Sequence, residues 1–81
     1  MNARVGIVDD HPSVILGVRT IINGQQDMRL AAGSATVAGL LGQLVPLDVV
    51  LLDLMLADGS MPAGNIEALA ALNIPAVVYT S

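Results

Sequence analysis

The sequence predicts an α/β fold built on a parallel sheet, and three observations lead to it. Short apolar runs alternate with segments of helical periodicity along the chain, which is the pattern of parallel sheets with right-handed crossovers. The run 49–52 is apolar at every position, as expected for a central strand that helices cover on both faces. The 81 residues are 54% apolar and only 12% charged, which excludes intrinsic disorder.

The first strand and helix occupy the N-terminal part of the chain. We expect a buried strand over residues 5–8, followed by a helix that begins near Pro12 and ends at Asn23-Gly24. The apolar positions of this helix share one face, and they are Val14, Val18, Ile21 and Ile22. A weaker strand is expected over residues 28–32.

Two further helices and two further strands complete the chain. Thr36 is the expected N-cap of the second helix, in which Gly39 and Gly42 each cost about 1 kcal/mol relative to alanine. The apolar face of this helix comprises Val37, Leu40, Leu41 and Leu44. After the strand 49–52, a third helix ends at Asn73, and its apolar positions are Ile66, Leu69, Ala70 and Leu72. The last strand is expected over residues 76–79.

Charge and composition exclude several classes of protein. Seven acidic residues accompany three arginines and no lysine, so the net charge is −4 and this chain is not expected to bind nucleic acid or an anionic membrane. The absence of cysteine excludes a disulfide scaffold, and a single histidine argues against a structural zinc site. No stretch reaches the roughly 20 apolar residues of a transmembrane helix, and the N-terminus does not resemble a secretory signal. A cytoplasmic protein is therefore expected.

Polar side chains directly follow three of the predicted strands. Asp9 and Asp10 come after the first strand, Asp53 comes after the third, and Thr80 and Ser81 come after the fourth. The carboxyl ends of parallel strands meet at one edge of the sheet, where such folds bind ligands. Three carboxylates held close together raise one another's pKa, and a divalent cation such as Mg²⁺ relieves this repulsion. Helix capping by the acidic pair and a strand-ending turn at Asp53 are the alternative interpretations.

Three segments in this order resemble the receiver domain of two-component response regulators. Val8-Asp9-Asp10-His11-Pro12 is similar to the acidic-pair motif of that family, above all in its branch with LuxR-type helix-turn-helix output. Residues 50–54 are similar to the strand that carries the phosphoaccepting aspartate, and residues 75–81 to the strand that ends in the switch hydroxyl. The spacings are also similar, with 43 positions from Asp10 to Asp53 and 27 positions from Asp53 to Thr80.

This resemblance implies a flavodoxin-like, doubly wound parallel sheet with the strand order 2-1-3-4-5. It implies that Asp53 accepts a phosphoryl group from a sensor histidine kinase and that Thr80 later hydrogen-bonds this group. It also implies a Mg²⁺ cofactor, held directly by Asp10, Asp53 and the backbone carbonyl of Met55, and mainly through water by Asp9. Such a chain is a phosphoprotein of a phosphorelay that takes part in its own phosphorylation, and it is not a turnover enzyme.

The sequence also departs from the family. The loop after Asp53 reads Leu56-Ala57-Asp58-Gly59 where Met-Pro-Gly is common. A fifth strand and two further helices, with a lysine and an aromatic switch residue, have no counterpart in these 81 residues. We therefore expect residues 1–81 to form a receiver that is incomplete after its fourth strand, with DNA binding left to an output domain outside this sequence. The strand 76–79 then forms a sheet edge, and we expect the chain to dimerise or associate through it rather than persist as a folded monomer.

Two other functions remain open from the sequence. A pseudo-receiver that serves only binding or dimerisation, without phosphotransfer, would have the same fold but usually lacks the acidic pocket that Asp9, Asp10 and Asp53 provide. A haloacid-dehalogenase-like phosphatase also uses an aspartate at a strand end, but that family places a second aspartate two residues later. Position 55 is methionine, so the phosphatase is the minor alternative.

Overall fold

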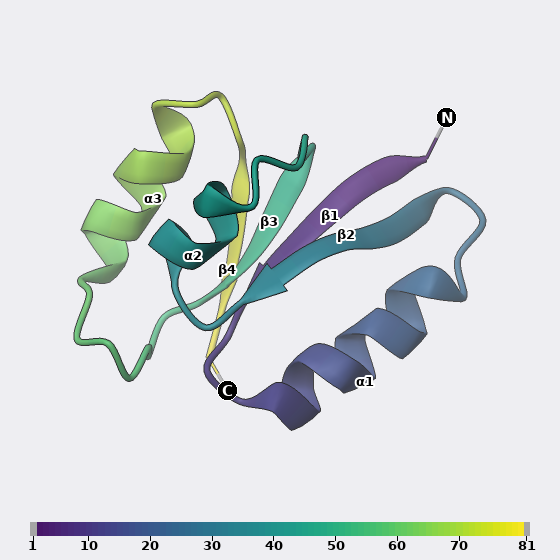
Figure 1. Ribbon diagram of the computed structural model, residues 1–81, viewed down its shortest axis with the longest axis horizontal. Coiled ribbons are helices and arrows are strands. Elements are labelled where there is room, and N and C mark those ends of the chain that lie inside the picture. The colour runs from purple at the N-terminus through teal and green to yellow at the C-terminus, as the bar shows by residue number, and fades with distance from the viewer. Residues whose placement is uncertain (1, 81) are drawn as a thin grey trace.

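The computed structural model of the protein describes residues 2–80, in which strands and helices alternate as the sequence predicts. The elements are β1 (Ala3–Val8), α1 (Pro12–Asn23), β2 (Met28–Ser34), α2 (Val37–Gly42), β3 (Val49–Asp53), α3 (Pro62–Ala70) and β4 (Ala76–Tyr79). All strand pairs are parallel, in the order β2-β1-β3-β4. Helix α1 lies on one side of this sheet, and α2 and α3 lie on the other (Figure 1). The predicted doubly wound parallel sheet is confirmed.

The strands are longer than their apolar runs, because backbone pairing continues past the apolar side chains. β1 is the central partner of β2 and β3, and its pairing with β2 runs from Ala3 opposite Met28 to Val8 opposite Ser34. β1 therefore begins two residues before the strand predicted over residues 5–8. β2 ends two residues after the strand predicted over residues 28–32. β4 has the bounds that the sequence predicts.

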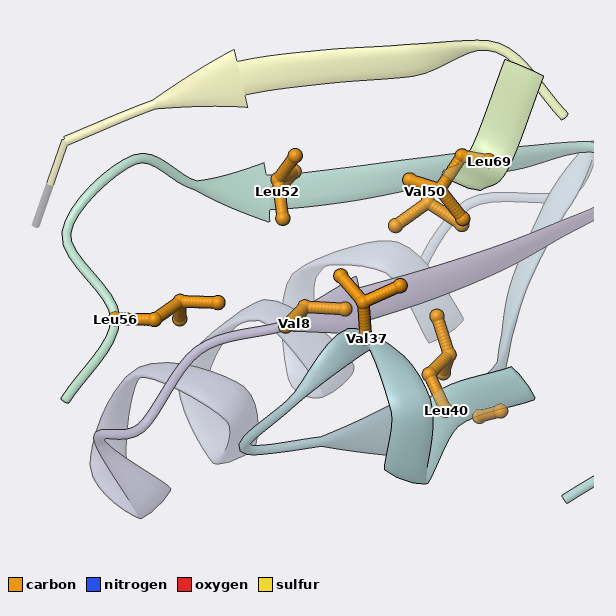
Figure 2. Packing of buried hydrophobic residues seen from close by; sticks show 8 residues of the cluster. Val8, Val37, Leu40, Val50, Leu52, Leu56 and Leu69 are labelled. Carbon is orange, nitrogen blue, oxygen red and sulfur yellow. The ribbon is translucent and has the colours of Figure 1, made fainter. Parts of the chain in front are cut away.

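The hydrophobic core lies between the sheet and the helices α2 and α3. Figure 2 shows Val8, Val50 and Leu52 on the strands, close to side chains of the two helices and of the loop after β3. The buried members of this cluster are Val8, Ala32, Val37, Leu40, Val50, Leu52, Leu56 and Leu69. Alternation along β1 and β3 places the other side chains of these strands, including Asp53 at the end of β3, on the opposite face.

Two glycines allow close packing on the core side of the sheet. A Cβ on Gly6 would lie 3.0 Å from a side-chain methyl carbon of Leu47, so a glycine in β1 leaves room for that leucine. A Cβ on Gly39 would collide with Oγ of Ser34, so this glycine lets α2 approach the end of β2. Thr36 caps α2 as predicted, since its Oγ1 accepts a hydrogen bond of 2.9 Å from the backbone N–H of Gly39.

Helix α1 covers the other face and has no fully buried residue. Ile15 contacts the sheet beside Gly33 of β2, while Val18 and Ile22 are half-buried on the same side. Ile21 was predicted to share the buried face, and this is wrong, because its side chain is 66% exposed. The buried stripe is centred between Ile15, Val18 and Ile22, so Ile21 falls at its margin.

Helices α2 and α3 end earlier than their apolar patterns suggest. Leu44 was predicted on the buried face of the second helix, but α2 ends at Gly42, and Leu44 is 88% exposed in a left-handed conformation with φ of 55°. In α3, Leu69 is fully buried, whereas Ile66 is 40% exposed and Leu72, beyond the last helical residue, is 56% exposed. No helix within residues 2–80 is long and apolar enough to cross a membrane.

An ion pair joins the start of β1 to the residue before β3. The side chain of Asp48 accepts hydrogen bonds from the backbone N–H, Nε and Nη2 of Arg4, at 2.6, 3.0 and 3.0 Å. The backbone N–H of Asp48 in turn donates to the carbonyl of Arg4 at 2.8 Å. These hydrogen bonds and the arginine charge lower the pKa of Asp48 to about 2 from its ordinary 3.8.

The Arg4–Asp48 pair predicts a specific acid sensitivity. Because the folded pKa of Asp48 lies below its unfolded value, the pair stabilises the fold above about pH 4, and this stability is lost as the pH falls toward 2. Thermal melts should place the midpoint of Asp48→Asn below that of the wild type at neutral pH, and the two midpoints should converge near pH 2. A constant difference over this range would contradict the prediction.

Candidate functional site: an acidic cluster at the carboxyl edge of the sheet

The ends of β1 and β3 bring together the three aspartates predicted as site residues. Val8 pairs with Leu52 in the parallel register of these strands, so the aspartates that follow them meet at the next position. Ligand atoms of Asp9, Asp10, His11 and Asp53 all lie within 4.8 Å of one another. The tertiary structure therefore places carboxylates from distant parts of the sequence in one cluster.

Asp9 is fully buried, and both of its carboxylate oxygens are engaged. Oδ1 accepts a hydrogen bond of 2.8 Å from the backbone N–H of His11 and lies 2.9 Å from Nδ1 of the same residue. Oδ2 accepts a hydrogen bond of 2.6 Å from the hydroxyl of Tyr79, a length typical of a charge-assisted bond. Burial raises the pKa of Asp9, but the hydrogen bonds from Tyr79 and His11 outweigh burial and hold this pKa below its ordinary value. Asp9 is thus a negatively charged side chain in a fixed orientation. Because both of its oxygens already accept hydrogen bonds, it is better placed to interact with a cation through water than directly.

Asp10 connects the turn after β1 to the loop after β3. Its Oδ2 accepts a hydrogen bond of 3.1 Å from the backbone N–H of Ala57. Its Oδ1 is buried, lies 3.1 Å from Nδ1 of His11, and accepts no hydrogen bond from the part of the chain that the structure describes. A buried carboxylate oxygen without a donor is costly, and a bound cation would remove this cost.

Asp53 is the last residue of β3 and is fully buried. Its Oδ1 accepts a hydrogen bond of 3.0 Å from the backbone N–H of Met55, which fixes the carboxylate relative to the loop that follows. The side chain of Met55 is 71% exposed, so this residue faces the cluster with its backbone. The role of the Met55 carbonyl as a cation ligand stays a prediction.

The predicted switch hydroxyl lies at the same edge of the sheet. Asp53 pairs with Tyr79 in the register of β3 and β4, and Thr80 follows directly as an exposed residue. The part of Thr80 in binding a phosphoryl group stays a prediction. Ser81, named with Thr80 in the sequence pattern, lies outside the described residues.

Two side chains in the cluster, His11 and Tyr79, were not among the predicted site residues. His11 is the N-cap of α1 and its ring is exposed, yet its Nδ1 contacts both acids of the pair. Its hydrogen bond to Asp9 and the charge of Asp10 raise the pKa of His11. Tyr79 was assigned only to the last strand, and the signal that could have indicated it is the register that pairs it with Asp53.

The donor set of the cluster fits a hard divalent cation. Carboxylate oxygens are the ligands that Mg²⁺ prefers, and it usually keeps several waters beside one or two protein carboxylates. Asp10 and Asp53 offer carboxylate oxygens from two neighbouring strand ends, and Asp9 adds negative charge from a fully buried position. The arrangement therefore provides the acidic site that the sequence predicted at this edge.

Comparisons with known proteins identify the fold. No protein-family model and no curated protein matches the sequence. Among solved structures, the response regulator ChrA of a heme-sensing two-component system is 27% identical, with a TM-score of 0.79 over 99% of this chain and 39% of its own. SdrG from Sphingomonas melonis Fr1 is 30% identical, with a TM-score of 0.71 over 95% of this chain and 66% of its own. The isolated REC domain of RcsB from Salmonella enterica serovar Typhimurium, solved with the phosphomimetic BeF3−, is 21% identical, with a TM-score of 0.83 over 99% of this chain and 62% of its own.

This chain corresponds to only part of each matched structure. This chain spans 39% of ChrA and 62% of the isolated RcsB domain, less than two thirds of either. The match covers 99% of this chain in both cases. The expected likeness to receiver domains is therefore confirmed, and the chain has the receiver fold of two-component response regulators.

Proposed function

We propose that this chain is the receiver segment of a transcriptional response regulator and accepts a phosphoryl group on Asp53 from a sensor histidine kinase. The observation that carries the proposal is the meeting of Asp9, Asp10 and Asp53 within 4.8 Å at the carboxyl edge of a receiver fold. Phosphoryl transfer depends on positioning and on neutralising charge more than on covalent help from other side chains. A carboxylate held in place beside cation ligands meets both requirements.

Asp53 is the proposed nucleophile. One of its carboxylate oxygens forms a bond to phosphorus, and the bond from phosphorus to the imidazole nitrogen of the donor breaks, with its electron pair returning to that nitrogen. The N–H of Met55 sets the direction of the Asp53 carboxylate, and the N–H of Ala57 holds Asp10 beside it. Thr80, exposed directly after β4, is available to hydrogen-bond the phosphoryl group once it is on Asp53.

The proposed cofactor is Mg²⁺, which Asp10, Asp53 and the backbone carbonyl of Met55 would hold directly and Asp9 through water. When bound, Mg²⁺ supplies positive charge that offsets the carboxylates and the incoming phosphoryl group. The buried Oδ1 of Asp10, which accepts no hydrogen bond within residues 2–80, supports this assignment. Both oxygens of Asp9 already accept hydrogen bonds, which supports its indirect role.

The wider role of the protein is proposed by analogy with structural neighbours. RcsB has been solved bound to promoter DNA in the presence of BeF3−, and as two dimers bound to two parallel DNAs. By analogy, we propose that this chain belongs to a cytoplasmic regulator that binds DNA through a LuxR-type output domain outside the present sequence. In this role the chain is a phosphoacceptor rather than a turnover enzyme.

Incubation with acetyl phosphate and Mg²⁺ tests the proposed function. Mass spectrometry of the intact protein should show the addition of one phosphoryl group, and peptide analysis should place it on Asp53. Removal of the cation by a chelator should prevent this addition. Absence of the added group at high donor concentration would favour a binding module without phosphotransfer.

We also propose that β4 mediates association between two copies of this chain. β4 is the last strand of the described sheet, and its Val77 and Val78 side chains are 54% and 44% exposed. Exposed, uncharged strand edges pair readily with other chains. Sedimentation at micromolar concentration should show dimers or larger species, and Val77→Lys should shift them toward monomer. A monodisperse wild-type monomer with a cooperative melt well above room temperature would contradict this proposal.

A further inference from the structure

Tyr79 spans the sheet above the proposed phosphoacceptor. Asp53 and Tyr79 are partners in the parallel register of β3 and β4, so their side chains point to the same face of the sheet. The hydroxyl of Tyr79 bonds Oδ2 of Asp9, which follows β1, two strands away. Neighbouring strands are about 4.8 Å apart, so the phenol ring must cross β3 at the level of Asp53.

Burial and charge agree with this geometry. Asp9 and Asp53 are both 0% exposed, whereas Tyr79 is partly exposed, as expected for a ring that lies over two carboxylates. Burial, the hydrogen bond to Asp9 and the nearby charge of Asp53 all raise the pKa of Tyr79, as expected for a phenol held close to both acids. The phosphoacceptor therefore lies beneath a side chain of its neighbouring strand.

We propose that Tyr79 is a latch over Asp53, anchored by its hydroxyl on Asp9, and that the ring must swing away before a phosphodonor reaches the Asp53 carboxylate. This inference rests on the proposed function of Asp53. Tyr79 is a positioning residue in this scheme, because it acts on access to the acceptor and on the orientation of Asp9. A phosphoryl group on Asp53 then fills the space beneath the ring and keeps the latch open.

The anchor determines how often the latch opens. A hydrogen bond to a charged group is among the stronger ones in proteins, and the bond from Tyr79 to Asp9 has the short length typical of this class. Removing the hydroxyl while keeping the ring should therefore raise the open population about tenfold. A ring that serves only packing would give no such change, because phenylalanine packs in the same way.

Initial rates of phosphorylation test the latch. Tyr79→Phe should label Asp53 about tenfold faster than the wild type when both are incubated with acetyl phosphate at saturating Mg²⁺. The matched control is Leu72→Ala, which shortens an exposed apolar side chain after α3, away from the cluster and from β4, and should label within about twofold of the wild type. Tyr79→Leu removes both the hydroxyl and the ring, and it should label at least as fast as Tyr79→Phe. If one of these two variants fails to fold, the other still tests the latch.

The outcomes separate the latch from the proposed function. If the wild type labels on Asp53 and the Tyr79 variants label no faster, the latch is overturned while the proposed function stands. If no variant takes a phosphoryl group on Asp53, the proposed function fails, and carbodiimide-driven coupling of an amine to Asp53 then decides the latch alone. Faster coupling at Asp53 in Tyr79→Phe, read by peptide mass spectrometry, supports the latch, and equal coupling overturns it.

Discussion

Replacing Asp53 by asparagine should abolish phosphoryl labelling of the protein. Asparagine keeps the shape of the side chain and an oxygen that accepts the N–H of Met55, so the end of β3 should fold as before. It lacks the second carboxylate oxygen and the negative charge, and an amide does not attack phosphorus as a carboxylate does. Intact-mass analysis after incubation with acetyl phosphate and Mg²⁺ should therefore show no added phosphoryl group.

The control for this substitution is Asp27→Asn, which removes an exposed carboxylate outside the cluster. This variant should label like the wild type, because Asp53 is intact. It controls for charge, because it changes the net charge of the chain by the same amount as Asp53→Asn. Thermal melts of both variants check that folding is retained. Labelling of Asp53→Asn at another aspartate, to the same extent as the wild type, would show that the acceptor is wrongly assigned.

Asp10→Ala should weaken Mg²⁺ binding by at least about tenfold. Replacing a residue that only supports a metal ligand already costs about this much affinity, so the loss of a direct ligand should cost no less. Asp10 offers the only buried carboxylate oxygen in residues 2–80 that accepts no hydrogen bond, and Mg²⁺ gives up its waters reluctantly without an anionic ligand. Alanine also removes the acceptor for the N–H of Ala57, which loosens the loop after β3. A Mg²⁺ titration followed by backbone amide chemical shifts measures the dissociation constant directly.

Glu67→Gln is the matched control for this titration. Glu67 is an exposed acid on α3, outside the cluster, so its replacement removes one negative charge without removing a ligand. We expect its dissociation constant to stay within about twofold of the wild type, the small effect of an exposed, screened charge. Equal dissociation constants for Asp10→Ala and the wild type would rule out the proposed ligand set.

Much of this fold could be predicted because each element depends on local patterns. The run 49–52 is apolar at every position, which identified β3, and Thr36 stands where an N-cap is needed, so α2 began as expected. The meeting of Asp9 and Asp53 also followed from the topology, because residues that follow neighbouring parallel strands share one edge. For β3 and α2 a few adjacent residues contained the whole signal, and for the two acids the alternation of strands and helices supplied it.

The errors occur where burial depends on what a helix packs against. Helical periodicity places Ile21 near the apolar face of α1, but the sheet contacts the side centred on Ile15, Val18 and Ile22. Leu44 follows the periodicity of α2, yet the chain leaves the helix two residues earlier and the side chain points to solvent. A hydrophobic pattern states which face is apolar, and only the packed partner decides how much of that face is covered.

The sequence by itself determined the parallel α/β architecture, the order of the elements and the acids that follow β1 and β3. The tertiary structure alone decided how these acids are held, because the bond from Tyr79 to Asp9 joins residues 70 positions apart and crosses an intervening strand. It also decided that the Asp53 carboxylate is buried rather than open to solvent. Strand register and side-chain reach set such contacts, and both depend on how distant segments pack rather than on any local pattern of residues.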